Sequence, residues 1–341
     1  MSTPHEQWKQ VMAMARGYRQ AQVLITAAHL GVFAQLAQEP QTAASLAAQL
    51  GANPGALRRL LDAAVALGLL QKTGERDARY ENAPLAASCL VPGREFYLGR
   101  LLQREGAFYR RWGALEKAVR TGERPPENVR DEAQEDWVRD FELALYDLAR
   151  VMGPAVAAAL ALPEDRPLRV LDVGGGHGGY SMALARRYPQ LAATVYELPA
   201  AAEVAREIIA SAGLSDRVDV QVGDFQKEEL GLGYDFVLLF GVLVSETTAG
   251  KEALLRKSHS ALTPGGTVAI RSFLLDDERT GPGEAALFSL HMLLSTDDGD
   301  LTTESGLQRL LSEAGFVSAH PVSLPPWTGS TLYVAEKPAA A

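Results

Sequence analysis

The stretch Arg169–Leu198, RVLDVGGGHGGYSMALARRYPQLAATVYEL, decides the fold of this 341-residue chain. Its apolar start, Val170 to Val173, predicts a strand buried on both faces, and a glycine-rich turn follows it directly. A helix over about Tyr180–Tyr188 and a second strand ending near Glu197 then complete a βαβ unit. The sequence therefore predicts one half of a nucleotide-binding α/β fold.

The glycine turn and the acid after the second strand predict how a nucleotide would be held. Glycine at 174 and 176 lets a ligand approach the backbone, and the first N–H groups of the next helix face it with partial positive charge. Glu197 follows about 20 residues later, the spacing at which an acid meets the ribose hydroxyls. Gly174, Gly176, Glu197 and the adjoining Leu198 are therefore predicted cofactor contacts. The glycine spacing itself fits both a dinucleotide and the looser methyltransferase pattern.

Two further acids favour a nucleoside that carries a cation. Asp172, at the end of the first strand, would repel a pyrophosphate but can accept hydrogen bonds from a cationic amino-acid group such as that of S-adenosylmethionine. Asp224 and Phe225 follow the next strand, where an acid can accept from the adenine amino group and an aromatic ring can pack on the base. The alternative for Asp224 is a turn or a helix N-cap.

The order of these motifs resembles the class I methyltransferases of the acetylserotonin and plant caffeate O-methyltransferase type, including bacterial relatives acting on polyketides, anthracyclines and pigments. The resemblance rests on VLDVGGGHGG, YELPAAAEVAREII, DRVDVQVGDF, ALTPGGTVAI and LLSEAGF, and it runs from about Tyr18 to the last strand. It implies S-adenosylmethionine as cofactor, S-adenosylhomocysteine as product, no metal, and a homodimer. The methyl group would lie near Gly174 and Phe240.

The predicted fold class is α/β, with a Rossmann-like seven-stranded methyltransferase domain preceded by a mainly helical winged-helix dimerisation domain. The expected boundaries are 1–115 for the dimerisation domain, 116–164 for a linker and connecting helix, and 165–341 for the S-adenosylmethionine-binding domain. Helices capped by Thr42 and Asn53 and a wing around Thr73–Arg76 carry the winged-helix prediction. The segment Thr121–Asp131 suits a linker.

Composition favours a soluble, cytoplasmic enzyme. The chain is 47% hydrophobic with a net charge of −9, and its apolar runs look too short to cross a bilayer. One cysteine, Cys89, and scattered histidines predict neither a disulfide nor a metal site.

Winged helices often bind DNA, but Arg58 and Arg59 are a weak basic patch, so we expect neither a nucleic-acid nor a membrane partner. A ligand-responsive DNA binder is the least favoured function. Dimerisation needs apolar surface instead, which the runs Gln22–Ala28 and Phe96–Leu102 provide, although each could also be core.

A long helix from about Ala133 to Ala161 carries Trp137, Phe141, Leu145 and Leu148 at helical spacing, a stripe that is more often core than pocket. The resemblance also implies that this helix lies over the methyl group. Phe141 and Tyr146 are therefore candidate contacts, and Arg139 is a candidate partner for the cofactor carboxylate. The predicted acceptor site consists of Trp112, Phe141, Tyr146, Phe288 and Met292.

The catalytic base of the plant enzymes is missing from this chain. Their histidine and aspartate follow the fourth strand, where this sequence has Val244 and Ser245. Two replacements are predicted: Glu246, at the rim of the crevice, and His291, among apolar residues of the acceptor helix. The alternatives are a cap for the helix starting near Thr248 and an ordinary core histidine.

The sequence thus predicts O-methylation of a small aromatic or polyketide-like secondary metabolite, by proximity or by a non-standard base. A second function remains open: an enzyme of the same fold that binds S-adenosylmethionine without transferring methyl, acting as a hydroxylase, decarboxylase or cyclase.

Overall fold

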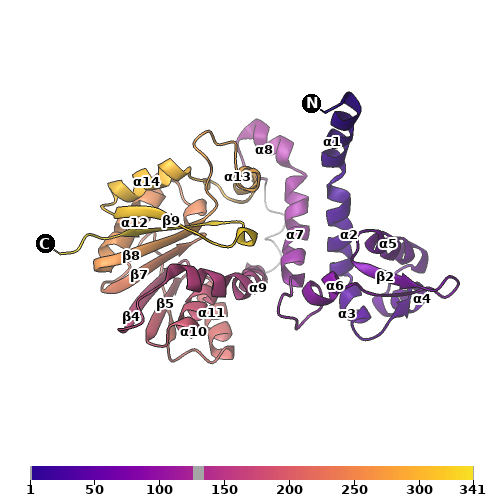
Figure 1. The fold of residues 1–341 in the computed structure, drawn as a ribbon, viewed down its shortest axis with the longest axis horizontal. Coiled ribbons are helices and arrows are strands. Elements are labelled where there is room, and N and C mark those ends of the chain that lie inside the picture. Colours follow the sequence, from indigo (N-terminus) through magenta and orange to yellow (C-terminus); the bar gives the residue numbers. More distant parts are fainter. Residues whose placement is uncertain (1, 126–133, 341) are drawn as a thin grey trace. The chain divides into compact units, whose positions relative to one another are not determined.

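The computed structural model describes residues 2–125 and 134–340, which form two compact units, Met1–Tyr109 and Arg110–Ala341 (Figure 1). The predicted subdivision at residues 115 and 164 stays a prediction.

The N-terminal unit combines helices with a small sheet. Its helices are α1 (Pro4–Arg16), α2 (Tyr18–His29), α3 (Val32–Leu36), α4 (Ala43–Leu50), α5 (Pro54–Ala66) and α6 (Pro84–Cys89), and α7 (Gly99–Trp112) begins in it. Its strands β1 (Gln41–Thr42), β2 (Leu70–Thr73) and β3 (Arg79–Asn82) pair in the order β1-β3-β2. Thr42 and Asn53 cap α4 and α5 through their side chains, and β2 and β3 form the wing. The winged-helix prediction is confirmed.

Helices α1 and α2 differ in what they bury. Ile25 and Ala27 of α2 are buried in the core of the unit, so much of the run Gln22–Ala28 is core rather than free surface. Helix α1 has no buried residue: Trp8, Val11 and Met14 are each at least 60% exposed. The largest apolar side chains of α1 therefore find no cover within their own unit.

The C-terminal unit is a doubly wound α/β fold. After α8 (Leu115–Thr121) and α9 (Gln134–Leu160), its elements are β4 (Leu168–Val173), α10 (Gly179–Arg187), β5 (Leu191–Glu197), α11 (Pro199–Ser211), β6 (Val218–Val222), β7 (Tyr234–Phe240), η1 (Leu243–Ser245), α12 (Thr248–Ala261), β8 (Leu262–Ser272), α13 (Gly283–Ser295), α14 (Glu304–Glu313), β9 (Val317–Val322), η2 (Pro326–Thr328) and β10 (Thr331–Glu336). The predicted seven-stranded sheet is confirmed, with the order β6-β5-β4-β7-β8-β10-β9. Strand β10 runs antiparallel to both of its neighbours, β8 and β9, and forms a closing hairpin with β9, whereas the other pairs of neighbouring strands are parallel.

Successive residues of the central strands pack into two separate cores, one on each face of the sheet. Val170 packs with residues of α10 and α11, whereas Leu171 packs with residues of α12 and α14 on the opposite face. Helices on both faces explain why these parallel strands read as continuous apolar runs. The same arrangement brings the carboxyl ends of β4, β5, β6, β7 and β8 to one edge, where ligands of such sheets bind.

Helix α9 corrects one expectation. Its stretch Trp137–Leu160, with a mean hydropathy of 1.4, is long and apolar enough to cross a membrane by length and composition alone. The structure gives the helix another role, because it packs along α10 and α11 with Ala149, Val156 and Ala157 buried. Charged residues such as Asp147 interrupt its apolar run, which is why the sequence did not indicate a stretch of this length. We interpret α9 as a core helix.

Candidate active site

The glycine turn between β4 and α10 needs glycine for two reasons. Gly174, Gly176 and Gly178 have φ values of 64°, 50° and 68°, a region that side chains disfavour. A Cβ at Gly176 would also collide with the carboxylate of Glu142 on α9. The turn can therefore be built only with bare backbone, which leaves its N–H groups accessible to a ligand.

Asp172 lies beneath this turn with an acceptor to spare. The side chain is 1% exposed, and its Oδ2 accepts a hydrogen bond of 2.7 Å from the Ser181 hydroxyl, whereas its buried Oδ1 has no partner. Burial raises the pKa of Asp172 to about 6; the nearby Glu197 adds to the rise and the Ser181 hydrogen bond opposes it. A buried acceptor without a donor is costly, and a cationic ligand group would satisfy it.

Glu197 is held at the end of β5, against the same turn. The backbone N–H groups of Leu198 and Gly176 donate to its carboxylate and lower its pKa, but burial is the larger effect and raises it. Leu198 itself is 52% exposed. The structure therefore brings Asp172, Gly174, Gly176 and Glu197 together, and their contacts with a cofactor stay predictions.

Asp224 and Phe225, which follow β6, give weaker support for a cofactor contact. Asp224 accepts from the Gln226 N–H at 3.0 Å and forms an ion pair with Lys227 at 2.8 Å, which is the turn role given above as the alternative. Phe225 is partly buried against the core formed with α12 and α14. Their contacts with adenine stay predictions.

An aromatic series connects the end of β7 with the glycine turn. Phe240 meets Tyr180 edge to face at 5.1 Å between ring centroids, and His177 lies between Tyr180 and Tyr146 at 6.3 and 5.9 Å. Burial lowers the pKa of His177 to about 3, and its Nδ1 accepts from the Gly179 N–H at 2.9 Å. His177 is a neutral residue that shapes the turn.

The turn after β7 contains Val244, the position at which the family resemblance implies a histidine. Val244, in η1, is 8% exposed and belongs to an apolar cluster with Leu275, Met292 and Leu301, to which Phe288 adds. Phe288 stacks on His291 with ring centroids 5.4 Å apart. Two of the side chains predicted for the acceptor, Phe288 and Met292, therefore belong to the apolar cluster around Val244.

Glu246 has a different role from the cap considered above. The helix N-cap is Thr247, whose hydroxyl accepts from the Gly250 N–H at 3.0 Å, so the capping alternative for Glu246 is wrong. Both oxygens of the 8% exposed Glu246 accept from Nε2 of Gln226, at 3.1 and 3.2 Å.

A polar cavity of about 310 Å³ brings the two candidate bases into one region. It is lined by Arg124, Gln226, Ser245, Glu246, Thr247, Ser295, Thr296, Asp297 and Asp298. The hydroxyl of Ser295 lies 3.4 Å from Nε2 of His291 on the same helix. Glu246 thus lines the cavity directly, and His291 reaches its wall through Ser295.

The remaining predicted contacts are dispersed over the unit. Trp112 ends α7, and Phe141 stacks on Trp137 with ring centroids 5.0 Å apart. Arg139 forms an exposed ion pair with Glu207 of α11 at 2.7 Å, so in this structure it is engaged away from the glycine turn.

Sequence reasoning missed Glu142, Ser181 and Arg271. Glu142 is a buried acid of α9, as is Asp147, and α9 carries several other charges, so no clear signal marked Glu142 in the sequence. Arg271 is a cation in the apolar strand VAIRS, where an unexpected charge was the available signal. Among the described residues, no group of three or more His, Cys, Asp or Glu could hold a metal ion.

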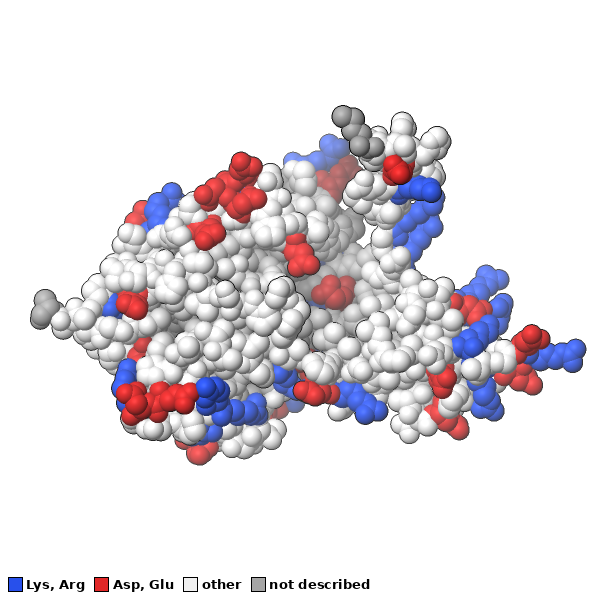
Figure 2. All heavy atoms as spheres, viewed as in Figure 1, with Lys and Arg blue, Asp and Glu red and all other residues white. Residues whose placement is uncertain are grey.

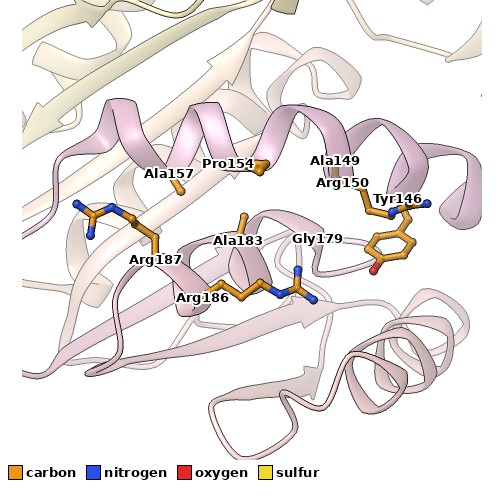
Figure 3. Close-up of a pocket in the computed structure, with 9 residues that line it drawn as sticks. All are labelled: Tyr146, Ala149, Arg150, Pro154, Ala157, Gly179, Ala183, Arg186 and Arg187. Atoms are coloured by element: carbon orange, nitrogen blue, oxygen red, sulfur yellow. The ribbon is translucent and has the colours of Figure 1, made fainter. Parts of the chain in front are cut away.

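A second cavity, of about 260 Å³, lies between α9 and α10. Figure 3 shows small side chains of both helices along its floor, including Ala149, Ala157 and Ala183, with arginines at its margin. Two of these arginines are paired, Arg150 with Asp147 and Arg187 with Glu164.

Figure 2 shows most charged side chains of the C-terminal unit along its edges in that view, with a broad uncharged area between them.

Comparison with known proteins places the site in context. A family profile for the O-methyltransferase domain matches residues 128–317, and one for the O-methyltransferase dimerisation domain matches residues 12–92. The chain is 35% identical to 3-hydroxy-5-methyl-1-naphthoate 3-O-methyltransferase of Streptomyces sahachiroi, over 83% of this chain and 82% of that protein. It is 32% identical to the tetracenomycin polyketide synthesis 8-O-methyl transferase TcmO of Streptomyces glaucescens, over 98% and 99%. A crystal structure of human N-acetylserotonin methyltransferase with bound S-adenosylmethionine has a TM-score of 0.88 at 29% identity and covers 99% of both chains.

Proposed function

This chain belongs to the O-methyltransferase family and is an S-adenosylmethionine-dependent methyltransferase with a dimerisation domain, and from this premise we propose that it methylates a hydroxyl group of a small aromatic or polyketide-like metabolite. The observation that carries the proposal is the apolar cluster of Val244, Phe288 and Met292 beside the polar cavity of Glu246. An aromatic acceptor needs both, an apolar wall for the ring and a polar end for the hydroxyl.

The cofactor fits the residues at the glycine turn. Asp172 offers an unpartnered buried oxygen for the ammonium group, and Glu197 an acid for the ribose hydroxyls. Gly174 and Gly176 admit the ligand to the backbone, and Leu198, Asp224, Phe225 and Phe240 are the further proposed contacts. When bound, S-adenosylmethionine supplies a methyl group activated by a positively charged sulfur. The protein contributes alignment, which can account for much of the rate of a displacement.

The chain must also receive the proton that a phenol loses. Glu246 is the first candidate, since its carboxylate lines the cavity and Gln226 fixes both of its oxygens. His291 is the second, since it stacks on Phe288 and lies 3.4 Å from the hydroxyl of Ser295, which lines the cavity. If neither acts, proximity alone carries the reaction, and the apolar surroundings of Val244 exclude water from the acceptor oxygen.

The names of the relatives support the acceptor class. One acts on a hydroxynaphthoate and another on a tetracenomycin polyketide, both as O-methyltransferases. We propose that Trp112, Phe141, Tyr146, Phe288 and Met292 contact an acceptor of similar size and aromatic character.

The test is incubation with labelled S-adenosylmethionine and a panel of naphthols, hydroxynaphthoic acids and phenols of graded acidity. We expect label in the acceptor and release of S-adenosylhomocysteine. Acceptors that bind but receive no label would instead favour the non-methylating alternative, a hydroxylase, decarboxylase or cyclase.

Glu246→Gln and His291→Ala identify the base. The variant that removes the base should lose roughly 10²- to 10⁴-fold in rate, most for the least acidic phenols. The exposed residues Glu278→Gln and His320→Ala are matched controls. Unchanged rates in both test variants would leave proximity as the mechanism.

A further inference from the structure

Arg271 lies next to the edge of the sheet at which the carboxyl ends of the parallel strands meet, and it has no assigned role. It is the penultimate residue of β8, and it pairs in register with Phe240, the last residue of β7. Ala269, two residues earlier, packs into the core formed with α9, α10 and α11, so Arg271 projects from that same face. Its guanidinium therefore lies beside the aromatic series of Phe240 and Tyr180.

The guanidinium has only weak partners. Nη2 donates to the thioether sulfur of Met152 at 3.0 Å, and the guanidinium carbon lies 5.3 Å from the centre of the Tyr180 ring. Nε is buried and has no hydrogen-bond partner. Within the part of the chain that the structure describes, no carboxylate forms an ion pair with Arg271.

Arg271 is partly buried, so solvent reaches part of its guanidinium, but the buried Nε still needs an acceptor, which a ligand would supply. An arginine stays charged at every physiological pH, and a thioether is a weak acceptor. A buried donor left without an acceptor costs free energy that folding alone does not recover. The missing group is an anion with two oxygens, because the guanidinium offers its donors as a planar fork.

The place of Arg271 favours an anion on the acceptor over the carboxylate of the cofactor. Asp172, the proposed partner of the cofactor ammonium, lies two strands away on the same face of the sheet. Arg271 instead pairs with Phe240, the residue expected beside the methyl group, which places the guanidinium toward the acceptor end of the cofactor.

We propose that Arg271 binds a carboxylate on the aromatic acceptor and so selects aromatic acids over neutral phenols. This inference rests on the proposed function, since it assumes an aromatic acceptor at the carboxyl ends of β7 and β8. It adds a specificity-determining residue on the face of the sheet opposite to α12 and α14.

Binding measurements test the inference without requiring turnover. The dissociation constants of 3-hydroxy-1-naphthoic acid and of its carboxamide are measured by calorimetry on full-length protein saturated with S-adenosylhomocysteine. The wild type should bind the acid more tightly than the amide. Arg271→Met, which keeps much of the side-chain volume, should weaken binding of the acid roughly 10- to 100-fold and that of the amide less than about threefold.

Arg271→Lys keeps the charge but loses the fork, and it should lie between these values. Arg256→Met, at an exposed residue of α12, is the control and should change neither constant. Because Arg271→Met could disturb packing against Tyr180, thermal melts of both Arg271 variants accompany the titrations.

Three results would overturn the proposal. They are equal binding of acid and amide by the wild type, equal weakening of both in Arg271→Met, and weaker binding of S-adenosylhomocysteine with the acid-to-amide ratio preserved. The last would assign Arg271 to the cofactor carboxylate. A wild type that binds the acid selectively but methylates neither compound would refute the proposed function and leave the carboxylate site standing.

Discussion

The carboxyl edge of the sheet has two parts that are built by different means. We call the part at β4 and β5 the cofactor edge, and the part at β7, together with α13, the acceptor edge. On the cofactor edge, Asp172 near the end of β4 and Glu197 at the end of β5 meet the glycine turn within a stretch of about 30 residues. On the acceptor edge, the cavity combines residues as distant in sequence as Arg124, Glu246 and Asp298. Local backbone geometry determines the first site, whereas tertiary packing determines the second.

The difference teaches how each edge tolerates change. A turn that requires glycine fixes the cofactor site, because almost any side chain there meets an obstacle. The acceptor edge has a packed apolar cluster around Val244, the position at which the family resemblance implies a histidine. The two edges should therefore respond separately to substitution.

Gly176→Ala is expected to have the largest effect on one edge without affecting the other. The new methyl group would meet the Glu142 carboxylate at a φ of 50°, which should weaken binding of S-adenosylhomocysteine by about 100-fold, as measured by calorimetry. Gly213→Ala is the matched control, since Gly213 has a φ of 67° but no neighbour within 4 Å. If Gly176→Ala binds S-adenosylhomocysteine as tightly as Gly213→Ala does, the contact of position 176 with Glu142 does not control the cofactor site.

The second-largest effect is expected when the pH is lowered, which should weaken ligand binding at the cofactor edge. Because the pKa of Asp172 is raised to about 6 without ligand, lowering the pH from 7 to 5 protonates it and should reduce affinity for S-adenosylhomocysteine about tenfold. The stability of the ligand-free protein should change in the opposite sense through this residue, increasing as the pH falls through 6, because the folded state then binds a proton that the unfolded state does not.

Asp172→Asn should bind the ligand weakly at both pH values, and Asp219→Asn, at an exposed residue of β6, should retain the wild-type profile. An unchanged pH dependence in Asp172→Asn would assign the titration to another group.

Gly299→Ala is expected to act on the acceptor edge alone. Its Cβ would lie 2.6 Å from the Val244 carbonyl oxygen and 3.0 Å from the Met292 methyl carbon, which should shift the apolar cluster. We expect kcat/KM for a naphthol acceptor to fall roughly 5- to 10-fold, since overpacking displaces these residues by a few tenths of an ångström. Gly283→Ala, at a glycine of α13 with open space around it, is the control. A matching loss of S-adenosylhomocysteine affinity would show that the two edges are coupled.

The smallest effect is expected from Thr247→Ala. Loss of this N-cap should lower the free energy of unfolding by about 1 kcal/mol, because the Gly250 N–H loses its acceptor. Chemical denaturation would measure the change, with the exposed Thr248→Ala as reference. A change in cofactor affinity would contradict the separation of the edges.

The sequence predicted the fold and the cofactor edge because their signals are local. The strand ending at Asp172, the glycines and the acid at Glu197 follow one another at spacings that backbone geometry imposes, and the caps Thr42 and Asn53 act within one helical turn. The acceptor edge could not be read in the same way. The partner of Glu246 is Gln226, from the segment after β6, and the predicted alternative of a helix cap belongs to Thr247 instead. Arg271 was overlooked because its strand reads as apolar core.

The exposed apolar side chains of helix α1 affect how the activity of the protein depends on its concentration. With Trp8, Val11 and Met14 all exposed, the isolated chain presents a hydrophobic ridge to water near its N-terminus. In a family defined partly by its dimerisation domain, covering that ridge is a source of association free energy that depends on concentration. Specific activity should therefore decline on dilution, and an assay at nanomolar enzyme would underestimate the rate that the same protein achieves at cellular abundance.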